Sequence, residues 1–274
     1  MALSRERNKP SSDLSNYVIF LAGDKKVGKT SFCAQFPDHF IFEFEAGNAK
    51  HLECTYADVS DLKTFEKLLK EAENTPWLKT LVLDEITYLY DMIMNDICEK
   101  EDVMDLIEIG YGRGWGMVKR IFQEYLRRIQ GIGCGVIYTA HTEIKTIKTR
   151  QSREVSKIEA NLAKQVGKDM DRLVHIWAVM QFGEESRRIM HIEGDDLLKA
   201  GHGFKGQCFK HVEKGTIFLG NSAKEAYRNF MDAWNNKPIQ EEVSSPVTAT
   251  PSKSSKNQKG KPKARNLKDQ GGGR

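Results

Sequence analysis

The chain has no long apolar run, and its few cysteines stand apart from one another, at Cys33, Cys54, Cys98, Cys134 and Cys208. No C-x-x-C pair occurs and no histidine stands at zinc-finger spacing, which argues against a structural zinc site or a paired redox motif. No stretch approaches the ~20 apolar residues that a membrane-spanning helix needs, and no secretion signal is evident. We therefore expect reduced thiols and a cytoplasmic protein that does not enter a membrane.

An excess of one charge is also lacking. The formal net charge is +4, with 39% hydrophobic and 29% charged residues among 274. This balance is ordinary for a soluble globular protein and does not by itself indicate nucleic-acid binding. A chain of this length can form one α/β domain or two small ones.

The two ends of the chain differ in composition from the middle. Residues 1–16 are polar and predict a flexible N-terminal arm. Residues 237–274 are mostly Ser, Pro, Thr, Gly, Lys and Asn, so they cannot bury enough apolar surface to fold. We expect a disordered basic tail there, available to a partner protein, and one domain over residues 17–236.

A short segment near the N-terminus carries the strongest signal. Residues 23–30 fit G-x-x-x-x-G-K-[ST], the phosphate-binding loop. The apolar run 17–22 predicts a buried strand before the loop, and residues 31–36 predict a helix after it, which is the context that the motif requires. The residues predicted to bind nucleotide are Gly23, Asp24, Lys25, Lys26, Val27, Gly28, Lys29, Thr30 and Ser31.

Each fixed position of the loop has a chemical reason. Gly23 and Gly28 let the backbone N–H groups turn toward an anion with no Cβ in the way. Lys29 is expected on the β- and γ-phosphates, and the Thr30 hydroxyl on a Mg²⁺ ion that bridges them. We therefore predict that the chain binds a nucleoside triphosphate with Mg²⁺. ATP is the expected nucleotide, although the residues do not distinguish it from other triphosphates.

Strand-like and helix-like segments alternate after the loop. Apolar runs predict strands at 39–45, 80–83 and 134–140, and helical spacing predicts helices at 60–74, 86–100 and 117–130. A late hairpin is predicted from 173–182 and 187–193, before a short strand at 216–219 and a helix at 223–234. Such alternation is typical of a mostly parallel sheet flanked by helices, an α/β fold.

Carboxylates stand where two of these strands end. Asp84 closes the apolar strand at 80–83 and is expected to hold the Mg²⁺ ion together with Thr30. Two acids could orient an attacking water: Glu85, directly after Asp84, and Glu45, at the end of the strand that follows the loop. The residues alone leave both open.

The order of these motifs resembles the RecA-like P-loop ATPase core, and more narrowly the small RecA/RadA-type phage ATPases of single-strand annealing and recombination, the AAA-domain Sak group. The matching pieces are Asn16-Tyr17, Phe36-Pro37-Asp38, Glu43-Phe44-Glu45-Ala46-Gly47, Leu81-Val82-Leu83-Asp84 and Thr139-Ala140-His141-Thr142-Glu143. The resemblance covers about residues 16–235.

This resemblance implies roles for particular residues. It favours Glu45 as the residue that positions water, while Glu85 departs from the family pattern and stays an alternative. His141 would sense the γ-phosphate and signal to a flexible, basic DNA-contacting loop over 143–158. Arg187 and Arg188 would reach the γ-phosphate of a neighbouring subunit.

The resulting hypothesis is an ATPase that couples ATP and Mg²⁺ to single-stranded DNA binding and to annealing or recombination. It would act as a homo-oligomer or filament, in the host cytoplasm if it is phage-encoded. The glycine-rich run 110–116 predicts a flexible connection in which Tyr111 and Trp115 could stack on bases. Two rival hypotheses are a nucleotide kinase with 143–158 as its lid and a non-hydrolysing nucleotide switch or adaptor.

Overall fold

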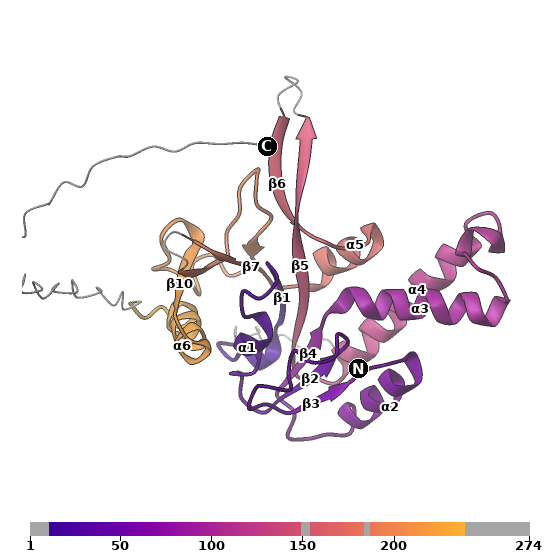
Figure 1. Ribbon diagram of the computed structural model, residues 1–274. Helices are drawn as coiled ribbons and strands as arrows, with labels where there is room; N and C mark the ends of the chain where they lie inside the picture. Colours follow the sequence, from indigo (N-terminus) through magenta and orange to yellow (C-terminus); the bar gives the residue numbers. More distant parts are fainter. Residues whose placement is uncertain (1–10, 149–153, 184–186, 239–274) are drawn as a thin grey trace, which may run out of the picture. The chain divides into compact units, whose positions relative to one another are not determined.

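The computed structural model describes residues 11–148, 154–183 and 187–238 (Figure 1). Its ten strands within those ranges are β1 (Val18–Gly23), β2 (His39–Glu43), β3 (Tyr56–Asp58), β4 (Thr80–Asp84), β5 (Gly135–Lys148), β6 (Glu154–Ala160), β7 (Ile176–Phe182), β8 (Arg188–His191), β9 (Gly201–His202) and β10 (Thr216–Gly220). The strand order is β10-β8-β7-β1-β5-β4-β2-β3, with β6 beside β5 and β9 beside β7. Six strands, β1 to β5 and β7, pair in parallel, whereas β6, β8, β9 and β10 pair antiparallel.

Helices cover both faces of this sheet. They are α1 (Lys29–Cys33), α2 (Leu62–Ala72), α3 (Ile86–Glu101), α4 (Arg113–Gly131), α5 (Lys164–Leu173) and α6 (Ala223–Trp234), with short 3-10 turns at Leu14–Asn16, Leu106–Ile109 and Glu213–Gly215. Alternate residues of β1 face opposite sides: Phe20 joins the core under α2, α3 and α4, and Leu21 joins the core under α1 and α6. The predicted α/β fold with a mostly parallel sheet is therefore confirmed.

The central strands are fully buried because both of their faces are covered. Every residue of β1 is buried, and so is every residue of β4. This explains why these strands were visible in the sequence as continuous apolar runs rather than as an alternating pattern. The late hairpin is also confirmed, since β7 and β8 pair antiparallel, and α6 spans the residues predicted for the last helix.

The prediction of a flexible loop over 143–158 is wrong for the described part of that segment. Strand β5 continues through it to Lys148 and pairs antiparallel with β6, from Thr142 opposite Ala160 to Lys148 opposite Glu154. Figure 1 shows this hairpin extending beyond the other strands. The alternating β-branched residues, such as Ile144 opposite Ile158, favour strand pairing, although the many charges between them obscured that pattern. Residues 149–153 lie outside the described ranges.

The glycine-rich run 110–116 is only partly a connection. Helix α4 begins at Arg113, four residues before the predicted start, and Gly112 precedes it in the left-handed region with φ 71°. Gly114 lies inside the helix, and a Cβ at this position would stand only 2.7 Å from the carbonyl oxygen of Leu106. The glycine therefore allows close packing of two backbones.

The described part of the predicted N-terminal arm is packed rather than loose. Leu14 is buried in the core, the Trp234 Nε1–H donates to the carbonyl of Ser12 at 2.7 Å, and the Tyr17 hydroxyl donates to the carbonyl of Ser11 at 2.7 Å. Residues 1–10 and the predicted tail beyond residue 238 lie outside the described ranges. Among the helices of the described chain, none has the length and apolarity that crossing a membrane requires.

Candidate functional site

The phosphate-binding loop begins at the end of the central strand. Strand β1 runs between β5 and β7 and ends at Gly23, where a Cβ would come 2.6 Å from the carbonyl oxygen of Met180 on β7. Gly28 has φ 107° and directly precedes α1. Both glycines are therefore required, the first for the close approach of two strands and the second for a left-handed backbone. The predicted order of strand, loop and helix is present.

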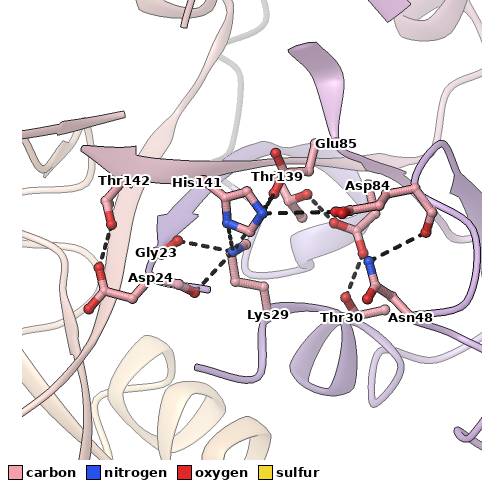
Figure 2. Close-up of polar contacts among 11 residues, drawn as sticks. Gly23, Asp24, Lys29, Thr30, Asn48, Asp84, Glu85, Thr139, His141 and Thr142 are labelled. Atoms are coloured by element: carbon pink, nitrogen blue, oxygen red, sulfur yellow. Dashed lines mark hydrogen bonds and ion pairs between the residues drawn. The ribbon is translucent and has the colours of Figure 1, made fainter. Parts of the chain in front are cut away.

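Lys29 extends from the first position of α1 back under the loop. Its ammonium donates to the carbonyls of Gly23 at 3.0 Å and Asp24 at 3.2 Å, and to Nδ1 of His141 at 2.9 Å (Figure 2). Burial lowers its pKa, and the nearby Glu85 carboxylate partly opposes that shift. Lys29 is thus a buried cation held where the loop turns.

His141 stands on β5 between a cation and an acid. Because an ammonium group can only donate, Nδ1 of His141 must accept from Lys29, which places the ring proton on Nε2. That proton points to Oε1 of Glu85 at 2.9 Å. Burial and the adjacent Lys29 charge lower the pKa of His141, so the imidazole is neutral at pH 7.

Asp84 and Thr30 form the oxygen-rich side of the site. The Thr30 hydroxyl donates to Oδ2 of Asp84 at 2.5 Å, and the Thr139 hydroxyl of β5 donates to Oδ1. A carboxylate beside a hydroxyl suits Mg²⁺, which prefers oxygen ligands and keeps several waters. No group of three acidic, histidine or cysteine side chains fit to hold a metal occurs in the described ranges. The remaining ligands of an ion here would therefore be phosphate oxygens and water.

Glu85 is buried in the site, which the sequence alone could not show. Its side chain is 7% exposed and its Oε1 lies 3.8 Å from the Lys29 ammonium. Burial raises the pKa of Glu85 to about 7; Lys29 acts against this shift, and Asp84 and Glu45 add to it. The peptide bond that joins Asp84 to Glu85 is cis. A carboxyl group that titrates near neutrality is suited to proton transfer.

Glu45 is the more exposed of the two candidate acids. Its side chain is 46% exposed, and Oε2 lies 4.0 Å from Nε2 of His141. Both acids line a single pocket of about 310 Å³ with ten other residues: Lys25, Lys26, Gly28, Lys29, Thr30, Ser31, Asn48, His51, Asp84 and His141. The structure therefore brings together four separate segments that the sequence had predicted for the site, namely the loop, Glu45, Asp84-Glu85 and His141, and it adds Asn48 and His51.

The two predicted arginines do not line this pocket. Arg188 opens β8, and its Nε donates to the carbonyl of Val27 in the loop of the same chain at 2.9 Å, while Nη1 donates to the carbonyl of Asn221 at 3.3 Å. The guanidinium also lies over the Phe182 ring. Arg188 therefore holds the phosphate-binding loop of its own chain. The family resemblance had instead implied a contact with the γ-phosphate of a neighbouring subunit. Arg187 is exposed beside it.

Sequence reasoning missed three contributors. Thr139 holds the second oxygen of Asp84, while Asn48 and His51 line the pocket from the turn after β2. Glu43, an acid between two buried phenylalanines, accepts from the backbone N–H of Ala49 at 2.5 Å and so fixes that turn. The sequence signal for Glu43 was an acidic residue within an apolar strand, because a buried carboxylate requires a hydrogen-bond partner.

The strand, loop and helix, with an aspartate at the end of β4, define a P-loop nucleotide-binding core. A family model described as an AAA domain matches residues 15–203, and the chain belongs to this family. Membership indicates a nucleotide-binding ATPase domain, and such ATPases generally use ATP with Mg²⁺. A search of curated proteins found no match.

Proposed function

We propose that this chain hydrolyses ATP in the pocket at the carboxyl ends of β1 and β4, beside His141, where the parallel pairing of β5 with β1 ends. The observation that carries the proposal is the convergence of Lys29, Thr30, Asp84, Glu85 and His141 around one cavity of about 310 Å³. These five side chains supply a phosphate-binding cation, oxygen ligands for Mg²⁺, a carboxyl group with a pKa near 7 and a neutral imidazole.

Lys29 changes partners when the triphosphate binds. Its donors, now held by the carbonyls of Gly23 and Asp24 and by His141, turn to β- and γ-phosphate oxygens. Thr30 and Asp84 would hold the Mg²⁺ ion, which would supply positive charge to the phosphate oxygens. His141 loses the Lys29 contact and keeps its Nε2–H for Glu85, so its position depends on the nucleotide.

Glu85 is our choice for the residue that orients and deprotonates the attacking water. Water oxygen forms a bond to the γ-phosphorus, the bond from phosphorus to the β,γ-bridging oxygen breaks, and Glu85 takes the water proton. The family resemblance favoured Glu45, but the Glu45 side chain is 46% exposed, whereas that of Glu85 is 7% exposed and burial raises the pKa of Glu85 to about 7. Glu45 remains the alternative that a matched pair of variants distinguishes.

We further propose that nucleotide state is coupled to single-stranded DNA binding in a homo-oligomer or filament, as the RecA-like resemblance implies. One continuous strand supports this coupling, because β5 carries His141 in the site and then forms the projecting hairpin with β6. The kinase alternative is less favoured, because the described lysines at 143–158 lie outside the nucleotide pocket and a lid would cover it.

The test is phosphate release from ATP, with and without single-stranded DNA, by the full chain and by Lys29→Ala. We expect Mg²⁺-dependent release that the DNA accelerates and that the variant loses. If the chain binds the magnesium-nucleotide complex but releases no phosphate, the hypothesis of a nucleotide switch would stand. Transfer of phosphate to a nucleoside monophosphate would establish a kinase. A properly folded protein with no affinity for any magnesium-nucleotide complex would overturn the whole proposal.

A further inference from the structure

A second cavity lies among α3, α4 and α5 and shares no lining residue with the nucleotide pocket. It measures about 620 Å³. Trp115 and Lys119, one helical turn apart on α4, line it opposite Lys164 and Lys168, one turn apart on α5. Tyr90 and Asp91 of α3 contribute to the same lining. We call this cavity the helical groove.

Buried hydrogen bonds fix the width of the helical groove. Asp169 of α5 is 4% exposed, and one of its oxygens accepts from the Gln123 amide of α4 at 2.9 Å. The other oxygen accepts from Gln165 at 2.8 Å. The bond from Gln123 joins α4 to α5, and the bond from Gln165 within α5 satisfies the second oxygen, so this buried carboxylate holds the two helices together.

The lysines of the groove differ from those of the β5–β6 hairpin. Within the described residues, Lys119, Lys164 and Lys168 form no ion pair with an acid. On the hairpin, Lys145 lies 2.8 Å from Glu143, and Lys157 lies 2.9 Å from Glu159. The hairpin lysines are thus largely neutralised by their neighbours, while the groove lysines present uncompensated positive charge.

The groove also continues toward the foot of the hairpin. An adjoining cavity of about 390 Å³ is lined by Lys164 and Lys168 again, and by Lys145 and Glu159 of the hairpin. The two cavities share Lys164 and Lys168 and together extend from α4 past α5, a length that fits a chain of phosphates better than a single small anion.

Exposed aromatic rings accompany this charge. Trp115 is 45% exposed where it lines the groove, and Tyr111, just before α4, is fully exposed. Asp91 is the acid of the groove, and partial burial raises its pKa. A π-face beside lysines on two helices is the combination that lets a protein hold unpaired bases and their phosphates together.

We propose that the helical groove binds a single nucleic-acid strand, with Lys119, Lys164 and Lys168 on phosphates and Trp115 stacked on a base. This inference rests on the proposed DNA binding and moves its main surface from the hairpin to α4 and α5. An acidic peptide would satisfy the lysines but would leave the Trp115 ring without a stacking partner, so the aromatic ring decides between the two polyanions.

The first experiment compares two matched triple variants of the full chain for binding of a labelled oligo-dT. One neutralises the groove (Lys119→Gln, Lys164→Gln and Lys168→Gln), and the other neutralises exposed lysines of α2 (Lys63→Gln, Lys67→Gln and Lys70→Gln). Each removes three charges, so the net charge is matched. We expect a loss of about tenfold to a hundredfold in affinity for the groove variant alone, and a salt dependence shallower by about 2, since each phosphate contact contributes ~0.7.

The second experiment tests stacking. We expect oligo-dT to quench the fluorescence of Trp115, so Trp115→Phe should remove the quenching, whereas Trp77→Phe, at another exposed tryptophan, should retain it. An abasic oligomer of equal charge should bind the wild type about tenfold more weakly. Asp91→Asn should strengthen binding, because it removes the acid from the groove.

The outcomes separate this inference from the proposed function. If the wild-type chain binds no single strand at low salt, the proposed DNA binding fails, and the inference fails with it. If the wild type binds and the groove variant binds as tightly as the α2 variant, the proposed function stands and the groove is overturned. If polyglutamate, the abasic oligomer and oligo-dT bind equally well, the ligand of the groove would be an acidic protein segment and not a nucleic acid.

Discussion

The nucleotide pocket and the helical groove both carry positive charge, but they hold it differently. In the pocket, Lys29 is buried and its ammonium is shared among two carbonyls and His141, with Glu85 nearby. In the groove, three lysines stand exposed, and none pairs with an acid of the described chain. Lys29 is thus held in one geometry before a ligand binds, whereas the groove lysines are solvated.

This difference predicts how each surface responds to change. Interactions between buried charges are strong and only weakly screened, so one substitution in the pocket should have a large effect that salt barely alters. Exposed lysines act additively and through released counterions, so single groove substitutions should be small and sensitive to salt. The following predictions test that contrast, from the largest expected effect to the smallest.

Lys29→Ala should lower ATP turnover by about a thousandfold, because it removes a preorganised cation from charge that develops on the phosphates. Steady-state phosphate release measures the effect. Lys63→Ala on α2 is the matched control and should turn over like the wild type. Near-normal turnover by the Lys29 variant would show that this pocket is not where hydrolysis occurs.

Glu85→Gln should lower kcat by about a hundredfold, whereas Glu45→Gln should lower it only a few-fold. A base acts as its carboxylate, and the pKa of Glu85 is raised to about 7, so kcat/KM should fall as pH drops through about 7. The pH profile of the Glu45 variant should keep this acid limb. The reverse ranking of the two variants would restore Glu45 as the base.

Arg188→Ala should raise KM for ATP about tenfold and change kcat little, because it removes a charge-assisted hydrogen bond that holds the loop carbonyl of Val27. Arg188→Lys should recover part of the affinity. A residue that acts on a neighbouring subunit would behave differently: kcat would fall at unchanged KM, and mixtures of the Arg188 and Lys29 variants would regain activity.

The groove triple variant should leave the free energy of unfolding unchanged within ~0.5 kcal/mol, because its three lysines are exposed and unpaired. Urea unfolding measures this value, with the α2 triple variant as control. A loss of several kcal/mol would mean that these lysines support the packing of α4 on α5, and would weaken the comparison between a built pocket and an open groove.

Much of the pocket was predictable because its rules are local. The glycines at 23 and 28 are dictated by backbone geometry. Asp84 ends β4, and His141 is the last residue of β5 that pairs in parallel with β1, so both lie at one edge of the parallel part of the sheet. The parts that escaped prediction depend on distant contacts. Arg188 meets Val27 across 161 positions of sequence, a contact for which no local pattern exists.

The hairpin and the groove show two further limits. Charged residues between Ile144 and Ile158 suggested a solvated loop, whereas ion pairs along and across the strands, such as Lys145 with Glu143 and with Glu159, allow those charges to lie on a strand. The groove combines residues of α3, α4 and α5, and the bond between Gln123 and Asp169 that joins α4 to α5 has no local signal in the sequence. The spacing of residues along one helix shows which side chains share a face, but it does not show which helix packs opposite that face.

The bond from Trp234 to Ser12 places the start and the finish of the described core beside each other. The chain could therefore be circularly permuted, with residue 238 spliced to residue 11 through a few glycines and fresh termini cut in the exposed turn at residues 131–133. Such a permutant should keep its fold, and its new termini would follow the C-terminal end of α4.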